Sequence, residues 1–165
     1  PKMTGGRFAY DHGDIAAMTP LLPMHTLGSH FVPPAIHAGG LRYHGMAPLV
    51  SQAIVEGLMS PTSVDQMHSY EAAIIWARTE GFVIAPETSN AVACVINEAK
   101  KAKKEGKEKV ILFNLSGHGL LDLAGYDKYL GGKLESSKIP AHEIERSLKL
   151  VQTAHKAPAR KTGKW

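Results

Sequence analysis

The sequence predicts an α/β fold of three layers, in which helices flank a parallel sheet and a long loop-rich segment forms the N-terminal part. Residues 69–119 alternate as helix, strand, helix and strand, which is typical of parallel strands joined by crossovers. Val110–Leu115 is an apolar run with a single Asn, as expected of a strand buried on both faces. The run ends in Ser116–Gly119 (SGHG), and ligands of such sheets bind beyond the carboxyl ends of the strands. A ligand contact and an ordinary strand-to-helix turn explain this ending equally well.

Composition restricts the class of protein. The chain has 165 residues, enough for one domain, and its 44% hydrophobic and 21% charged residues are globular values. The single cysteine, Cys94, cannot form an internal disulfide, which fits a reducing compartment and a cytoplasmic location. No run approaches the ~20 apolar residues of a membrane span, so we predict no membrane partner.

The formal net charge of +4 comes from lysines within residues 100–109 and from basic residues within 156–164. A small basic nucleic-acid-binding domain is one reading of this excess. No aromatic residues lie between the lysines, and Glu105 and Glu108 interrupt them. A solvated helix end and a loose tail are therefore favoured, and we predict no nucleic-acid partner.

Residues 1–48 are rich in Gly and Pro and read as loop. Five histidines lie here, but their spacing matches no zinc motif, and we predict no metal bound by them. A loop of this length is unusual unless something else packs it. The chain begins with Pro1, so we expect this segment to pack on a part of the protein that precedes it. The predicted division is 1–48, an α/β domain over 49–135, and a C-terminal helix with a basic tail over 136–165.

The elements follow in order. Apolar spacing predicts a helix over residues 48–58 and a short strand over 64–68. A second helix over 69–80 is predicted to begin at the capping residue Ser69 and to end at Gly81.

The second half of the chain continues the alternation. Phe82–Ile84 reads as a short buried strand, and residues 89–105 as a helix that ends at Gly106. After the apolar run, residues 120–130 are predicted as a helix or turn and 139–155 as an amphipathic helix. The last ten residues read as a tail.

Two predicted strands are followed by polar residues, Glu87 and Ser116. If the strands are parallel, both residues lie at the same sheet edge. From the residues alone, Glu87 is better explained as an acid at the start of the next helix. Ser116 and His118 are poorly spaced for a nucleophile and its base, and no GxSxG motif surrounds them.

Several motifs together resemble the C-terminal part of the tryptophan synthase β-chain family. The residues that carry this resemblance are RTEG at 78–81, PETSNA at 86–91 and NLSGHG at 114–119. Upstream, YDHGD at 10–14, TPLL at 19–22 and HAGGLRYHG at 37–45 resemble the longer, second type of β-chain. The resemblance covers about residues 5–134.

The resemblance implies a pyridoxal-phosphate-dependent lyase of the tryptophan-synthase fold type, active in tryptophan biosynthesis. In the complete enzyme it condenses L-serine with indole to give L-tryptophan by β-replacement. Pyridoxal phosphate is the implied cofactor. The alternative is a non-catalytic binding domain that keeps the same fold.

The resemblance also implies roles for individual residues. Ser116 matches the serine whose hydroxyl bonds the pyridine nitrogen, and Gly117 follows it at the cofactor. Glu87 matches the glutamate near the cofactor ring, with a catalytic role, and Gly40 matches the glycine whose backbone lies against the cofactor.

Three neighbouring residues carry further implied roles. Tyr43 and Gly45 fall where backbone carbonyls help to hold a monovalent cation. Arg42 replaces an Asp of the better-known β-chain and is implied to pair with a substrate carboxylate or an acidic partner residue during gating.

Other family features are missing from the sequence. His118 replaces the family arginine, and with Arg42 this argues against carrying over communication with an α-chain. No lysine matches the one that carries the cofactor, and no GGGSN phosphate loop occurs. We therefore expect a fragment that is inactive alone. Its expected partners are the N-terminal remainder of the same enzyme and a second copy in a homodimer.

Overall fold

The structure is a computed structural model that describes residues 2–136 and 138–154 of the chain, except for the side chains of residues 152–154. These residues form two compact units that interleave along the sequence. The hairpin unit comprises residues 2–33, 43–63 and 139–154, and the helix unit comprises residues 34–42, 64–136 and 138. The segment 1–48 therefore contributes to both units, and it is not loop throughout.

The hairpin unit is built on two antiparallel strands, β1 (Arg7–Asp11) and β2 (Leu22–Thr26). Alternate residues of each strand are buried, with Ala9 directly opposite Met24. This alternation is typical of a ribbon with one covered face. No sequence pattern predicted this hairpin, because each strand has only five residues and the intervening segment is rich in turn-forming residues.

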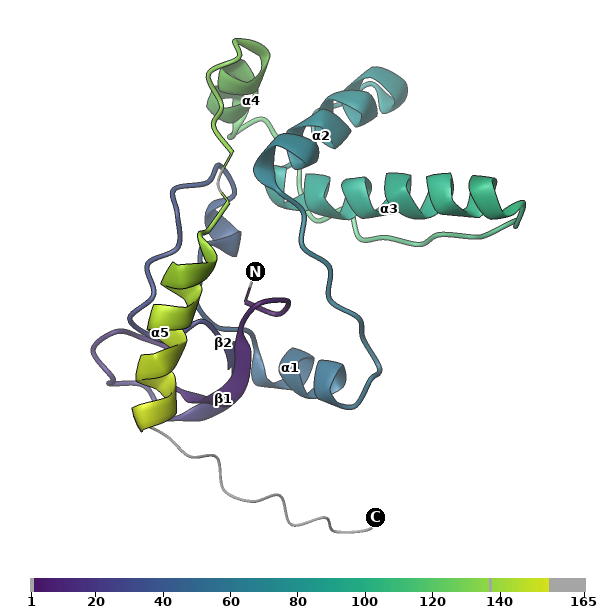
Figure 1. Ribbon diagram of the computed structural model, residues 1–165. Coiled ribbons are helices and arrows are strands. Elements are labelled where there is room, and N and C mark those ends of the chain that lie inside the picture. Colours follow the sequence, from purple (N-terminus) through teal and green to yellow (C-terminus); the bar gives the residue numbers. More distant parts are fainter. Residues whose placement is uncertain (1, 137, 155–165) are drawn as a thin grey trace. The chain divides into compact units, whose positions relative to one another are not determined.

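Two helices cover the hairpin. The predicted helix at 48–58 is confirmed as α1 (Pro48–Val55), and the predicted C-terminal helix is α5 (Ala141–Ala154). The buried hydroxyl of Ser51 in α1 accepts a hydrogen bond from the backbone N–H of His25 at 2.9 Å, which fixes α1 to β2. α5 packs against β1 (Figure 1). The predicted tail lies outside the described residues.

The helix unit contains the short 3-10 helix η1 (Gly39–Leu41) and the helices α2 (Gln66–Glu80), α3 (Pro86–Glu105) and α4 (Leu123–Leu130). α2 and α3 pack on each other and are the longest elements of the unit (Figure 1). The buried core of the unit consists of Tyr70, Ala72, Ala73, Ile84, Val92, Ala93, Tyr126 and Leu134.

The ends of α2 and α3 follow local capping chemistry. Gly81 and Gly106 end these helices with φ angles of 82° and 63°, as predicted. The predicted start of α2 at Ser69 is wrong, and so is the predicted strand over 64–68. The carboxylate of Asp65 accepts the N–H groups of Met67 and His68 at 2.9 and 3.2 Å, so Asp65 caps the helix and the helix begins at Gln66.

The apolar run Val110–Leu115 differs most from its prediction. It is extended but pairs with no other strand of the described residues. Phe113 packs against the core of the helix unit, whereas Val110 and Leu112 are 100% and 95% exposed. A strand buried on both faces is therefore incorrect for this chain, because only one face of the segment has a neighbour.

The mixed α/β class is confirmed, but the described residues form no parallel sheet. Their one sheet is the antiparallel β1–β2 pair. Phe82–Ile84 is not a regular strand; it forms an isolated antiparallel bridge between Ile84 and His118. Extended segments form a sheet only where other strands satisfy their backbone groups, and residues 2–136 and 138–154 supply no such strands to these segments.

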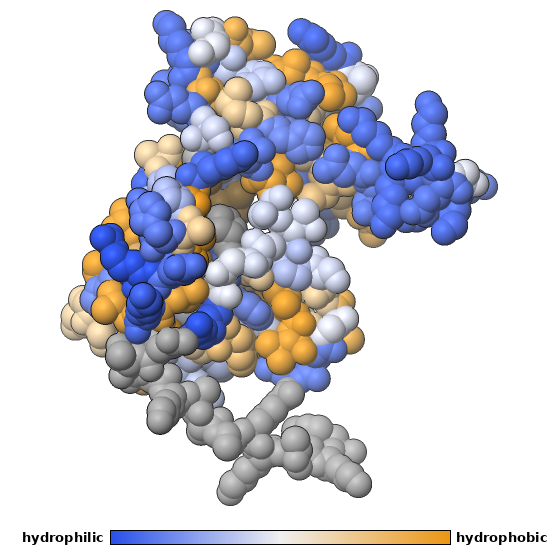
Figure 2. Space-filling model, viewed as in Figure 1, coloured by the Kyte–Doolittle hydropathy of each residue, from blue (hydrophilic) through white to orange (hydrophobic). Residues whose placement is uncertain are grey.

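The basic run lies at the C-terminal end of α3, where hydrophilic side chains cover the helix (Figure 2). Lys109 pairs with Glu98 at 3.3 Å and Lys107 with Glu105 at 3.2 Å. The lysines therefore belong to a solvated, partly charge-paired surface. None of the described helices combines the length and apolar character needed to cross a membrane.

A buried tyrosine links α4 to the rest of the helix unit. The hydroxyl of Tyr126 donates a hydrogen bond of 2.5 Å to the backbone carbonyl of Ile84, and both residues are buried. The Tyr126 ring also meets the Tyr70 ring edge-on, with centroids 5.1 Å apart. Tyr129, one turn of α4 further on, stacks on Tyr70 from another side.

We expect Tyr126→Phe to lower the free energy of unfolding by about 1–3 kcal/mol, because it leaves the buried Ile84 carbonyl without its donor. Tyr129→Phe is the matched control, since the Tyr129 hydroxyl bonds no other described residue. Urea unfolding of both variants checks this. Equal stability of the two variants would contradict it.

Alkaline pH should destabilise the chain through the same tyrosines. Burial raises the pKa of Tyr126 to about 12 and that of Tyr70 further, from an ordinary value of 10.0. The folded state therefore retains both phenol protons more strongly than the unfolded chain does. This stabilisation is complete below about pH 10 and is lost as the pH rises towards 12. Urea unfolding across this range checks it, and Tyr126→Phe should reduce the slope.

Candidate functional site

The candidate site of the helix unit is formed where Ser116–Gly119 docks on the segment that leads into α3. The N–H of Gly119 bonds the carbonyl of Val83 at 2.8 Å, and the N–H of Ala85 bonds the carbonyl of Gly117 at 2.9 Å. The two polar segments of the prediction are thus neighbours. The pairing between them is a single antiparallel bridge between Ile84 and His118, and the two predicted strands form no parallel pair among the described residues.

The glycines of this loop allow close packing. A Cβ atom on Gly119 would lie 2.4 Å from the carbonyl oxygen of Ile84 and 2.6 Å from Cγ1 of Val83. On Gly117 it would lie 3.3 Å from Cβ of Ala85. Neither glycine has a positive φ angle. They are required because two backbone segments approach each other, not because the loop is left-handed.

Ser116 is exposed, and its hydroxyl is held from the α3 side. Its Oγ lies 2.8 Å from Oγ1 of Thr88, a buried residue in the first turn of α3. Thr88 also donates a longer hydrogen bond, 3.4 Å, to the carbonyl of Gly117. No sequence pattern predicted this role of Thr88, because the contact spans 28 residues and depends on where the Ser116 loop docks.

Glu87 lies inside α3 rather than before it, because the helix begins at Pro86, three residues earlier than predicted. Its Oε1 accepts the backbone N–H of Gly40 at 3.1 Å, across 47 residues of sequence. The carboxylate therefore makes no cap for its own helix, although the first turn favours its charge. This bond fixes η1 beside the start of α3.

The other predicted site residues divide between the two units. Arg42 ends η1 in the helix unit and donates from Nε to the carbonyl of Pro34 at 3.0 Å. Tyr43 and Gly45 belong to the hairpin unit. The helix unit thus contains Gly40, Arg42, Glu87, Ser116 and Gly117. The hairpin unit contains Tyr43 and Gly45.

The backbone around Tyr43 already has a cation. The Lys2 ammonium donates to the Tyr43 carbonyl at 3.2 Å and lies 5.7 Å from the centroid of the Tyr43 ring. Burial lowers the pKa of Lys2. At Gly45, a Cβ atom would come within 2.4 Å of the Met24 sulfur, so this position is tightly packed. Within the described residues, no three His, Cys, Asp or Glu side chains gather as a metal site.

These features define the class of protein: a mixed α/β protein in which a serine loop and a glutamate meet at the first turn of a long helix. Comparison with curated proteins shows which proteins the chain is similar to. The chain is 58% identical over 135 residues to tryptophan synthase beta chain 2 of Methanosarcina mazei, covering 82% of this chain and 30% of that protein. Proteins of the same name from Pyrococcus abyssi and Thermotoga maritima are each 57% identical, over 135 and 126 residues.

The matched residues are homologous to tryptophan synthase beta chains, which confirms the recognition made from the motifs. The matches cover 82% and 76% of this chain in the Pyrococcus and Thermotoga comparisons. The chain spans only about 30% of the length of these relatives, in agreement with a C-terminal portion of such a protein. A scan against protein-family models found no match.

We expect Gly119→Ala to destabilise the chain by about 1–3 kcal/mol, because the new methyl group meets backbone atoms that cannot move aside independently. Gly39→Ala is the control, since its Cβ would have no neighbour within 4 Å; its effect should stay within about 0.5 kcal/mol. Urea unfolding distinguishes the two. Similar losses for both variants would show that Gly119 is not a point of close approach.

Proposed function

We propose that this chain provides the pyridine-ring side of a pyridoxal phosphate site in a tryptophan synthase β-type enzyme, which condenses L-serine with indole to give L-tryptophan. The observation that carries the proposal is the junction at the first turn of α3. There the Ser116 hydroxyl lies 2.8 Å from that of Thr88, and Glu87, the residue before Thr88, accepts the Gly40 N–H at 3.1 Å. The homology with tryptophan synthase beta chains supports the same assignment.

The residues present fit one end of this cofactor. Ser116 offers an exposed hydroxyl, which can donate to or accept from a ring nitrogen. Gly39 and Gly40 are exposed and lack side chains, so a flat ring can approach their backbone. The phosphate needs several N–H donors or a cation, and this donor set does not supply them. The fit is therefore to the ring and not to the phosphate.

Ser116 would set the charge on the ring nitrogen. When bound, pyridoxal phosphate withdraws electrons from the α-carbon of an amino-acid substrate. A carboxylate beside the ring nitrogen would hold it protonated, whereas the neutral Ser116 hydroxyl, positioned by Thr88, does so weakly. Weaker stabilisation of negative charge favours early departure of the β-hydroxyl. Ser116 thus biases the site towards β-replacement.

Glu87 would act beside the ring. Its bond to the Gly40 N–H keeps the glycine backbone turned towards α3, and its charge remains close to the reacting groups. Arg42, one residue after η1, would bind the substrate carboxylate or an acidic residue during gating. The Tyr43 and Gly45 carbonyls would contribute to a monovalent cation site. The Lys2 ammonium would compete with that cation for the Tyr43 carbonyl.

The remainder of the site would come from other residues of the enzyme. We propose that the lysine that carries the cofactor and the phosphate loop lie outside these 165 residues, so that the chain alone is inactive. Val110–Leu115 would join a parallel sheet supplied by that remainder. The assembled enzyme would be a cytoplasmic homodimer without a required α-chain.

The test is made in the complete enzyme, with this chain joined to the rest of the β-type protein. Ser116→Ala should lower kcat for L-serine and indole about 10- to 100-fold, the equivalent of a hydrogen bond worth about 1.5–3 kcal/mol. Ser116→Thr keeps the hydroxyl and should recover most of the rate. The cofactor absorbance spectrum should change in the alanine variant only. An alanine variant with normal rate and spectrum would remove the proposed role of Ser116.

A further inference from the structure

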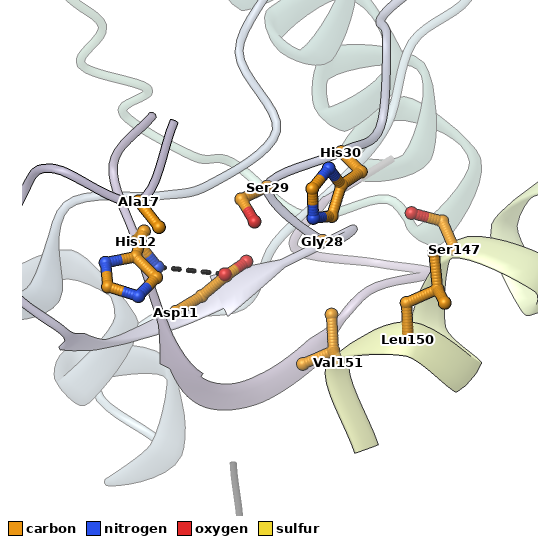
Figure 3. A pocket seen from close by; sticks show the side chains of 9 residues that line it. All are labelled: Asp11, His12, Ala17, Gly28, Ser29, His30, Ser147, Leu150 and Val151. Carbon is orange, nitrogen blue, oxygen red and sulfur yellow. Dashed lines mark hydrogen bonds between the residues drawn. The ribbon is translucent and has the colours of Figure 1, made fainter. Parts of the chain in front are cut away.

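The hairpin unit contains a cavity of about 400 Å³ that the proposed function does not use. It lies between the end of β1, the loop after β2 and one side of α5 (Figure 3). Its volume is within the range of small-molecule sites, roughly 300–1,000 Å³. The lining residues are Asp11, His12, Ala17, Gly28, Ser29, His30, Ser147, Leu150 and Val151.

The chemical centre of the cavity is Asp11, which is only 3% exposed. Its Oδ1 accepts the backbone N–H of His12 at 2.8 Å, and its Oδ2 accepts the hydroxyl of Thr26 at 2.7 Å. Both donors are neutral. The nearest ionisable nitrogen, Nε2 of His44, is 4.0 Å away and lies 2.9 Å from the carbonyl oxygen of His12.

A buried carboxylate is costly unless a positive charge compensates it. A carboxylate has about four acceptor positions, and the hydrogen bonds to His12 and Thr26 use two of them. In Figure 3 the Asp11 side chain projects into the space between Ser29 and α5. Asp11 therefore offers a cationic ligand both charge and unused acceptor positions.

The opposite wall is apolar with a polar edge. Leu150 and Val151 of α5 face the cavity, with Ser147 beside them (Figure 3). Gly28 permits this close packing of α5: its φ angle is +100°, and a Cβ there would lie 2.8 Å from the Ser147 hydroxyl. The side chains of Ser29, Ser147 and His30 form no hydrogen bond with another described residue. Their polar atoms remain available to a ligand.

We propose that this cavity binds a small primary ammonium compound, with its ammonium on the Asp11 carboxylate and its apolar body against Leu150 and Val151. The negative charge of Asp11 disfavours anions. A metal ion would need further ligands, and the described residues provide no group of three. A free amine and an amino acid share this chemistry. An amino acid would add a carboxylate, which Ser29, Ser147 and His30 can bind.

The test titrates the full 165-residue chain by NMR with 3-methylbutylamine, L-leucine and 3-methylbutanoate. The ammonium compounds should bind with shifts at the Gly28, Ser29 and Val151 amides, and the anion should not. Tighter binding of leucine identifies an amino-acid site, and tighter binding of the amine a site for simple amines. The proposal is overturned if only 3-methylbutanoate binds, or if neither ammonium compound binds at millimolar concentration.

Two variants test the residues. Asp11→Asn keeps the shape of the side chain and should weaken ammonium binding about tenfold or more, since the group that accepts the hydrogen bond loses its negative charge. If that variant does not fold, Leu150→Ala decides instead: Leu150 is 54% exposed, so the fold tolerates its truncation, and affinity should fall about threefold or more. Unchanged affinity in the folded variants overturns the proposal.

Discussion

The helix unit depends on the pair of backbone hydrogen bonds between residues 83–85 and the loop 117–119. They place the loop against the entry to α3, and the Tyr126 hydroxyl closes the same segment from the other side through the Ile84 carbonyl. The loop therefore bonds the two neighbours of Ile84, Val83 and Ala85, and α4 bonds the Ile84 carbonyl itself, while the Ile84 side chain lies in the core. Because the position of Ser116 follows from this docking, the geometry of the candidate site is a consequence of main-chain pairing and not of side-chain contacts alone.

Local sequence signals predicted the helices better than the extended segments. Gly81 and Gly106 end their helices as predicted, since capping depends on a few neighbouring residues. The starts were less accurate: α2 and α3 begin at Gln66 and Pro86, each three residues earlier than predicted. Strands depend on partners far away in sequence, so Val110–Leu115 was predicted correctly as extended but incorrectly as buried on both faces.

The candidate site shows the same difference between features that local sequence predicts and features that depend on distant residues. Motif resemblance selected Glu87, Gly40 and Ser116, and the structure joins Glu87 to Gly40 directly. No pattern in the sequence predicted the Thr88 hydroxyl beside Ser116, because the contact depends on where the loop docks and not on spacing along the chain. The Asp11 cavity was likewise missed, since it requires the β1–β2 hairpin and α5, whose residues lie more than a hundred positions apart.

The exposed edge at Val110–Leu115 has a consequence for handling the protein. A hydrophobic extended segment with unsatisfied N–H and C=O groups is a template for strand addition, so copies of the chain can pair through it and aggregate. Lys107 and Lys109 precede the segment and act as gatekeepers, since stacking identical copies would bring their like charges together. Aggregation during expression would then compete with the sheet pairing proposed above, and co-synthesis with the proposed remainder of the enzyme would suppress it.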